Sequence, residues 1–136
     1  MSKYSKEWSE QRINTSTNSH VLEELKTREP IFHHPDKFGK TKRDIENQMC
    51  EEFWEVGASG NIYTREYVID VLLKRYADPD YKDVWETKDF DLIQIAPDNY
   101  LVTYVLIQGD RITRRATIWR NVDGHWKIVY HQGTLV

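Results

Sequence analysis

The spacing of apolar positions changes part-way along the chain, from a helical period to the alternation typical of strands. Val21, Leu22 and Leu25 lie on one side of a short amphipathic helix that is predicted to begin near residue 20. Pro30 ends this helix, because proline cannot donate its backbone hydrogen bond inside a helix. Residues 1–19 show no such period and are rich in polar side chains, so we expect a flexible tail followed by a single domain over residues 20–136.

Two further helices are predicted from residue types that cap helix N-termini. Thr41, with Asp44 three positions later, forms a near capping box and predicts a helix over residues 41–53. Thr64 caps the next helix, over residues 64–76. The positions expected on the buried sides are Ile45, Met49 and Phe53 in the former helix, and Tyr67, Val68, Val71, Leu72 and Arg75 in the latter.

The second half of the chain alternates between strand-like segments and tight turns. Besides a short strand near residues 53–57, the pattern predicts strands over residues 85–96, 100–108, 111–121 and 125–134. Turns this close together force an antiparallel meander. Helices first and a sheet last predict an α+β domain, in which a long twisted sheet bends and the helices cover its concave side.

Turn geometry determines which side chains meet across neighbouring strands. Gly109-Asp110 is a natural two-residue hairpin loop and pairs Tyr104 with Arg115. A three-residue loop that ends at Gly124 pairs Arg115 with His131. This register places on one face of the sheet the side chains of Tyr104, Arg115, Thr117, Trp119 and His131.

The opposite face of the sheet is also substantially apolar, and we expect it to form the interface of a homodimer. It carries Leu101, Thr103, Ile118, Ile128, Tyr130 and Gln132. The register of the last hairpin remains open, however. A plain two-residue Asp123-Gly124 turn would pair His131 with Ala116 and would turn the histidine to this opposite face.

Three segments carry a resemblance to known proteins: FWEVGASGNIYTREYVIDVL, APDNYLVTYVL and RRATIWRNVDGHWKIVYHQGT. Over residues 20–136 the chain resembles a group of small bacterial proteins of the nuclear transport factor 2-like superfamily, most of them without an assigned function. More distantly it is similar to the polyketide-cyclase-like (SnoaL-like) and ketosteroid-isomerase-like enzymes. The W-x-x-x-D-G-x-W pattern from Trp119 to Trp126 is also similar to the association domain of calmodulin-dependent kinase.

The resemblance implies a fold and a cavity but no reaction. In this cystatin-like fold a bent antiparallel sheet wraps around short N-terminal helices and forms a cone with an internal pocket. In the association domain, the position two residues before the first tryptophan of the last hairpin faces the cavity, which implies the same for Thr117. The catalytic Asp and Tyr of the isomerases cannot be matched residue by residue, so no isomerase activity is carried over.

Tyr104, Arg115 and His131 are suited to bind an anionic or carbonyl-bearing small molecule. Arginine can hold a carboxylate by two hydrogen bonds, tyrosine can donate another, and histidine can exchange a proton near neutral pH. Glu55, on the first strand, is either a general base or an ion-pair partner of Arg115. We therefore expect catalytic roles for His131 and Glu55, and ligand-binding roles for Tyr104, Arg115, Thr117 and Trp119.

Two kinds of function remain open at this point. The first is a protein that binds a small carbonyl or carboxylate compound and acts on it as a cofactor-free lyase, isomerase or hydrolase. The second is a non-catalytic binding or assembly module, in which the sheet mainly forms the dimer. In that case the polar cluster would satisfy itself, with Glu55 neutralising Arg115.

The composition of the chain limits which partners and which cellular location we expect. The net charge is -3 and basic residues are interspersed with acidic ones, so we expect no nucleic-acid partner. No apolar run is long enough to cross a bilayer, no signal peptide is evident, and Cys50 is the only cysteine, so we expect a cytoplasmic protein without membrane contact. The side chains of adjacent histidines point in different directions, so we expect no metal site at His33, His34 and Asp36. We also expect no cofactor.

Overall fold

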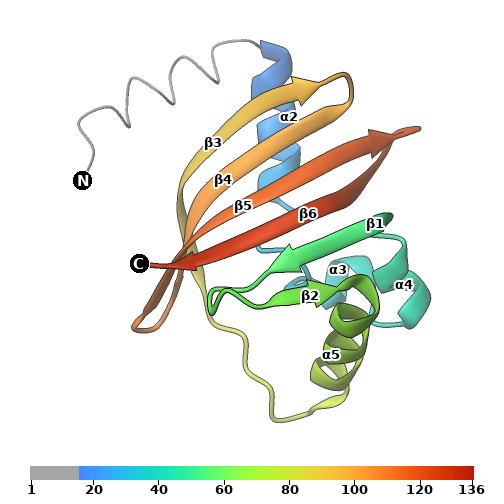
Figure 1. Ribbon diagram of the computed structural model, residues 1–136, viewed down its shortest axis with the longest axis vertical. Helices are drawn as coiled ribbons and strands as arrows, with labels where there is room; N and C mark the ends of the chain where they lie inside the picture. The colour runs from blue at the N-terminus through green and yellow to red at the C-terminus, as the bar shows by residue number, and fades with distance from the viewer. Residues whose placement is uncertain (1–15) are drawn as a thin grey trace.

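A six-stranded sheet with helices on one side organises residues 16–136, which are the residues that this computed structural model describes. Figure 1 shows helix α2 crossing behind the strands and the other helices gathered near β1 and β2. In chain order the elements are α2 (Ser16–Lys26), α3 (Pro35–Phe38), α4 (Lys42–Glu46), β1 (Met49–Val56), β2 (Ile62–Thr64), α5 (Arg65–Ala77), β3 (Glu86–Ala96), β4 (Asn99–Gln108), β5 (Arg111–Val122) and β6 (His125–Leu135). No helix within this range is long and apolar enough to span a bilayer.

The strands follow the order β2-β1-β6-β5-β4-β3 across the sheet. β3 to β6 form the antiparallel meander that the closely spaced turns predict. β1 pairs antiparallel with β2 but parallel with β6. Because β1 reaches the meander only through β2 and helix α5, no tight turn sets its direction relative to β6. The bent sheet and its helices confirm the predicted α+β class.

The helix caps were predicted more accurately than the helix ends. Thr41 and Asp44 form a full capping box at α4, with both hydrogen bonds at 3.1 Å. The prediction that this helix continues to residue 53 is wrong, because α4 ends at Glu46 and strand β1 begins at Met49. A spacing of four, as between Met49 and Phe53, places two side chains on one side of a helix and also on one face of a strand.

The first helix begins earlier than its apolar pattern indicates. α2 starts at Ser16, so residues 16–19, which we expected in the tail, belong to the helix. Residues 1–15, the rest of that expected tail, lie outside the described residues.

The register between β4 and β5 follows the prediction from Gly109-Asp110. Gln108 pairs with Arg111, and Tyr104 pairs with Arg115. In the last hairpin, by contrast, the predicted three-residue loop is wrong. Val122 pairs with His125 around the two-residue turn Asp123-Gly124, whose φ values of 51° and 85° are both positive, as a tight hairpin turn requires.

A β-bulge at Val129 compensates for the shorter loop. The register shifts by one residue between the Trp119–Ile128 pair and the Ile118–Tyr130 pair. His131 therefore pairs with Thr117 and keeps the concave face that the prediction gave it, although it does not pair with Arg115. Between the bulge and the turn, the alternation of inward-facing and outward-facing side chains is the reverse of the predicted one. The prediction that Ile128 lies on the outer face is therefore wrong, because Ile128 is buried in the core and only 1% exposed.

The core fills the space between the concave face of the sheet and the helices. The helices contribute Leu22, Leu25, Ile45, Val68, Ile69 and Leu72, and the strands contribute Met49, Phe53, Leu92, Val102, Leu106, Trp119 and Ile128, among others. This packing leaves one end of the concave face, near β1, β6 and α5, for a cavity.

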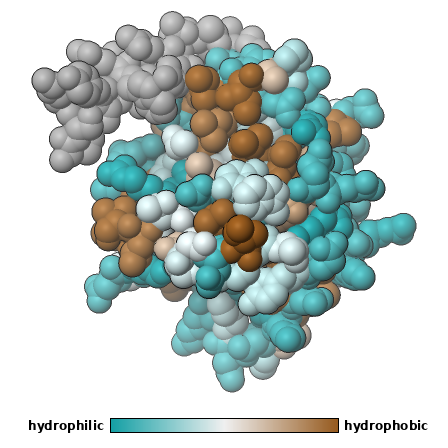
Figure 2. Space-filling model, viewed as in Figure 1, coloured by the Kyte–Doolittle hydropathy of each residue, from teal (hydrophilic) through white to brown (hydrophobic). Residues whose placement is uncertain are grey.

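The outer face of the sheet carries an apolar row that crosses five strands. From β3 to β1 the paired positions are Ile93, Leu101, Ile118, Tyr130 and Trp54. Trp54 is 43% exposed, and its ring centroid lies 4.8 Å from that of Tyr130. Figure 2 views the sheet from the side opposite helix α2 and shows hydrophobic side chains gathered over the strands with hydrophilic ones around them.

Candidate functional site

A cavity of about 330 Å³ lies between the concave face of the sheet, helix α5 and the loop that follows α2. All five positions of the predicted α5 stripe line it, including Tyr67, which is 53% exposed instead of buried. The ionisable side chains of the lining, apart from tyrosines, are His33, Glu55, Arg75, Arg111, Arg115 and His131. A second hollow of about 250 Å³ shares four of these residues and extends to Gly133. The main cavity is at the small end of the range for ligand pockets.

Arg115 is the central cation of this cavity. It lies against Gly133, where an added Cβ would come within 3.3 Å of the arginine Nε. Its Nε donates to Thr113 Oγ1 at 2.9 Å, and its Nη1 donates to His131 Nε2 at 3.2 Å. Among the described residues no carboxylate forms an ion pair with Arg115, and nothing accepts a hydrogen bond from its Nη2. One arm of the guanidinium fork is therefore unused.

His131 is buried and both of its ring nitrogens are engaged. A guanidinium can only donate, so Nε2 of His131 accepts from Arg115 and carries no proton. In the neutral ring Nδ1 then carries the hydrogen and donates to Thr117 Oγ1 at 2.8 Å. Burial lowers the pKa of His131 to about 3, and the charge of Arg115, with that of His33 once it is protonated in acid, adds to this shift. At neutral pH this histidine is an uncharged link that orients Arg115.

Glu29 forms the buried end of the same hydrogen-bond chain. It lies in the loop after α2 and is 1% exposed. Its Oε1 accepts from the Tyr104 hydroxyl at 2.8 Å and from the Ile31 backbone N–H at 3.2 Å. Its Oε2 accepts from Trp119 Nε1 at 3.0 Å, and the Thr117 hydroxyl donates to the same carboxylate. Burial raises the pKa of Glu29, while these donors act in the opposite direction.

The structure divides the six expected site residues into two groups. Glu55, Arg115 and His131 line the cavity. Tyr104, Thr117 and Trp119 lie behind it, where their polar atoms point to Glu29. Tyr104 also stacks on Phe90, with ring centroids 4.8 Å apart. These three residues share the face of Arg115 as predicted, but their position favours support of the cavity wall over direct contact with a ligand.

Glu55 stands beside His131 in the cavity, because the two residues pair across β1 and β6. No described residue forms a hydrogen bond or an ion pair with its carboxylate. Burial raises the pKa of Glu55, and the charges of Arg115 and Arg75 oppose that shift from a distance. Glu55 is therefore a carboxyl group without a contacting partner among the described residues, and it does not neutralise Arg115 by contact.

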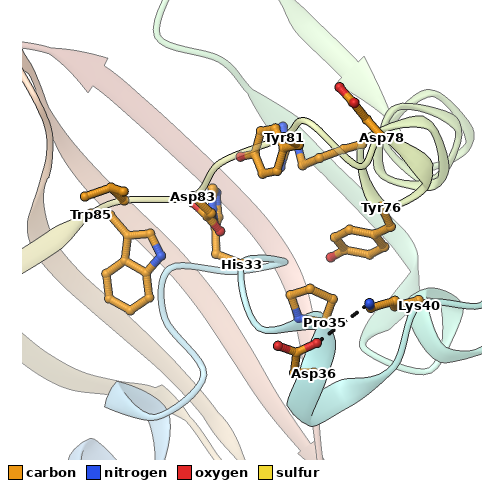
Figure 3. Close-up of a pocket in the computed structure, with 11 residues that line it drawn as sticks. His33, Pro35, Asp36, Lys40, Tyr76, Asp78, Tyr81, Asp83 and Trp85 are labelled. Carbon is orange, nitrogen blue, oxygen red and sulfur yellow. Dashed lines mark hydrogen bonds and ion pairs between the residues drawn. The ribbon is translucent and has the colours of Figure 1, made fainter.

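The loop side of the cavity holds a second histidine. His33 Nδ1 lies 2.8 Å from Asp83 Oδ1 and 2.9 Å from Oδ2. His33, Arg75 and Tyr81 also line an open hollow of about 620 Å³, shown in Figure 3, so these three residues form the wall between the two spaces. The neighbouring His34 turns away and bonds through Nε2 to the Glu29 carbonyl at 2.8 Å. No cluster of three or more metal-ligating side chains occurs in the described part of the chain.

Comparison with solved structures identifies the architecture. An NTF2-like protein from Cytophaga hutchinsonii superimposes with a TM-score of 0.67 at 16% identity, over 90% of this chain and 100% of that chain. The chain has a nuclear transport factor 2-like (NTF2-like) fold. A Pectobacterium atrosepticum protein of unknown function from the DUF3225 family gives a TM-score of 0.62 at 18% identity, over 90% and 94% of the two chains.

The NTF2-like fold is also shared with a candidate calcium/calmodulin-dependent kinase II association domain from Exiguobacterium sibiricum. The TM-score is 0.60 at 14% identity, over 90% of this chain and 95% of that chain. Identities this low show the fold alone. No protein-family model matches the sequence, and neither does any curated protein.

Two features of this NTF2-like site were missed from the sequence. Glu29 was given no role, and His33 was considered only as a metal ligand together with His34 and Asp36 and then assigned to a loop. Nothing in the sequence around Asp83 indicates a functional residue, because this segment shows no periodic spacing of apolar residues. A buried carboxylate has no periodicity, so only the presence of several donors without obvious acceptors, such as Tyr104 and Trp119, could have indicated one.

Proposed function

We propose that this protein binds a small organic anion, with Arg115 holding its carboxylate inside the cavity. The observation that carries the proposal is the mostly buried guanidinium of Arg115, which has no carboxylate in contact and one unused donor arm. Burying a charge is costly unless it is paired, and burial lowers the pKa of Arg115. A ligand carboxylate would supply the missing partner through a forked pair of hydrogen bonds.

The charges around the cavity support the same choice of ligand. Arg75, Arg111 and Arg115 contribute three guanidinium groups, whereas Glu55 contributes one carboxyl group. Burial lowers the pKa of both His33 and His131, so neither histidine adds a positive charge at neutral pH. The excess of positive charge favours an anion, and the apolar side of α5 favours an organic one.

Catalysis by this protein would be cofactor-free. Glu55, with its raised pKa and no contacting partner, is suited to exchange a proton with a bound carbonyl or carboxylate compound. His131 acts in this proposal by orienting Arg115, since both of its ring nitrogens are engaged. A lyase, an isomerase or a hydrolase could each use this arrangement.

A thermal-shift screen of small carboxylic acids, each paired with its neutral amide, tests the binding proposal. At a ligand concentration about 100 times Kd, an acid should raise Tm by roughly 10 °C. Its amide should have little effect, and Arg115→Met should abolish the shift. Arg114→Met is the matched control, because Arg114 is the neighbouring residue on the outer face and is exposed. Acids that fail to shift Tm, or that stabilise Arg115→Met equally, would contradict the proposal.

The apolar row on the outer face favours a second role, the assembly of a homodimer. Trp54, Tyr130 and Ile118 lie in paired positions across β1, β6 and β5, and an exposed apolar band of this kind is typical of an interface. We expect light scattering to find a dimer at micromolar concentration and Ile118→Arg to give a monomer. The control is Val136→Arg, at a residue that is 70% exposed beyond the end of β6. A monomeric wild type would rule out this interface.

A further inference from the structure

The histidine–carboxylate pair on the loop side of the cavity has a geometry different from that of His131. His33 belongs to the loop after α2, and Asp83 belongs to the segment between α5 and β3, 50 residues further along the chain. The side chain of His33 is 11% exposed and that of Asp83 is 24% exposed, so the pair is sheltered but reachable. Figure 3 shows both residues beside Tyr81 and Trp85.

The pairing fixes which nitrogen of His33 carries a hydrogen. Both carboxylate oxygens of Asp83 lie within 2.9 Å of Nδ1, and a carboxylate only accepts hydrogen bonds. Nδ1 is therefore protonated and donates, which leaves the lone pair of the neutral ring on Nε2. No described residue makes a hydrogen bond to Nε2 of His33. Of the two histidines that line the cavity, only His33 has a free basic nitrogen.

We propose that His33 and Asp83 form an acid–base dyad, in which Nε2 of His33 takes a proton from a carbonyl-bearing anion held by Arg115. This inference rests on the proposed function and adds a catalytic residue to it. Burial and the charge of Arg75 lower the pKa of His33, whereas Asp83 raises it, so the ring is a neutral base that gains a stabilising partner on protonation.

The proton transfer needs no co-reactant. Nε2 takes a proton from the carbon next to the ligand's carbonyl group. The electron pair of that C–H bond forms a C=C bond to the carbonyl carbon, and the π pair of the C=O bond moves to the oxygen to give an enolate. The imidazolium that forms stays hydrogen-bonded to Asp83, and the enolate charge lies among the guanidinium groups of the cavity. Return of the proton to the same or another atom of the ligand completes an exchange or an isomerisation.

The first test uses the wild-type chain and therefore depends on no variant. Diethyl pyrocarbonate acylates unprotonated imidazole nitrogens, and mass spectrometry locates each modified histidine. We expect His33 to react at least about tenfold faster than His131, whose nitrogens are both engaged. Equal rates at the two residues would overturn the dyad.

The second test measures proton transfer with pyruvate and 2-oxobutanoate as probes, both of which carry a carboxylate and a carbonyl with an adjacent C–H bond. Proton NMR in D₂O follows the loss of that C–H signal, and the protein should accelerate it over buffer. His33→Gln should reduce the acceleration by about 100-fold and Asp83→Asn by about tenfold. His125→Gln and Asp80→Asn, at exposed positions, are the matched controls and should behave as wild type.

The outcomes separate the dyad from the binding site. Binding of the probes that depends on Arg115 but gives no exchange dependent on His33 would overturn the dyad and leave the proposed function intact. Absence of any binding dependent on Arg115 would overturn both. Exchange that survives in His33→Gln but is lost in Glu55→Gln would assign the base to Glu55 instead.

Discussion

The two walls of the cavity hold a histidine each, and they hold it in opposite ways. On the sheet wall, His131 lies in a continuous hydrogen-bond chain from Arg115 through Thr117 to Glu29, and both ring nitrogens of His131 have a partner. On the loop wall, His33 has one partner, Asp83, and a free nitrogen. The residues of the sheet wall lie in β-strands, whereas His33 and Asp83 of the loop wall lie in segments without regular secondary structure.

The contrast indicates how this fold can combine stability with chemistry. A buried polar group that is fully satisfied rigidifies its neighbours, and its loss leaves several donors without acceptors. A half-satisfied group at a sheltered surface contributes little to stability but keeps a reactive atom available. We therefore expect substitutions on the sheet wall to reduce folding stability, and substitutions on the loop wall to change proton transfer.

Glu29→Gln should have the largest effect on stability. The amide NH₂ would face donors such as Trp119 Nε1 or the Tyr104 hydroxyl, so at least one buried hydrogen bond would be lost. We expect a loss of about 2–4 kcal/mol in the free energy of unfolding, measured in urea. Glu23→Gln, at a side chain that is 74% exposed, is the control and should change stability by less than about 0.5 kcal/mol. A loss of less than about 1 kcal/mol in the free energy of unfolding of Glu29→Gln would contradict the view that the sheet wall stabilises the fold.

Acidification should weaken the fold through His131. Its pKa of about 3 in the folded protein lies below the usual value of 6.5, so on acidification the unfolded chain binds a proton at His131 before the folded protein does. The stability from this group is present above pH 6.5 and is lost as pH falls towards 3, at up to about 1.4 kcal/mol per pH unit. The raised pKa of Glu29 acts in the opposite sense, because it favours the folded state on acidification and that contribution is lost as pH rises.

Comparison with His131→Gln isolates the contribution of the histidine. The variant should be less stable at pH 7 but should lack this part of the acid loss, so the two unfolding free energies should converge as pH falls from 7 to 4. His125→Gln, at an exposed residue, should follow the wild type. Parallel pH profiles of wild type and His131→Gln would show that His131 is not held neutral by the fold.

Arg115→Met should raise the pKa of His131. The substitution removes the second-largest cause of the lowered pKa, while burial, the largest, remains. The pKa should therefore rise but stay below 6.5, as followed by NMR titration of the ring protons. Glu55→Gln should have a smaller effect, because no ion pair connects Glu55 with Arg115. A His131 signal that does not respond to Arg115→Met would mean that the Nη1 contact is absent in solution.

Asp83→Asn should have the smallest effect on stability and a clear effect on His33. The pair is partly exposed, so we expect a loss of less than about 1 kcal/mol in urea unfolding. The pKa of His33 should fall further, because the hydrogen bond and the charge of Asp83 are what raise it. Asp80→Asn, in the same segment, should leave the His33 titration unchanged. An unchanged pKa in Asp83→Asn would show that the dyad does not form.

Local signals in the sequence predicted much of the fold. Thr41 and Thr64 cap the helices that they were expected to cap, and Gly109-Asp110 sets the β4–β5 register as predicted. The bulge at Val129 could not be foreseen, because no glycine marks it. The extra residue of the bulge turns His131 to the concave face, so the predicted face of His131 is right even though the predicted loop is wrong.

The site required contacts that no local pattern encodes. Glu29 meets Tyr104 and Trp119 across 75 and 90 positions of sequence. His33 and Asp83 come from two loops, where neither periodicity nor turn chemistry fixes a direction. Register arguments along strands could bring Arg115, Thr117 and His131 together, but they could not show what packs against them.

The extra residue in β6, Val129, affects the bend of the strand without affecting the direction of the side chains that follow it. Deletion of Val129 would leave Tyr130 opposite Ile118 and His131 opposite Thr117, so every later side chain would keep its direction. What would disappear is the local bend and added twist that a bulge imposes on its strand. A chain shortened by this one residue would keep the same inward-facing side chains on a strand with less bend and less twist.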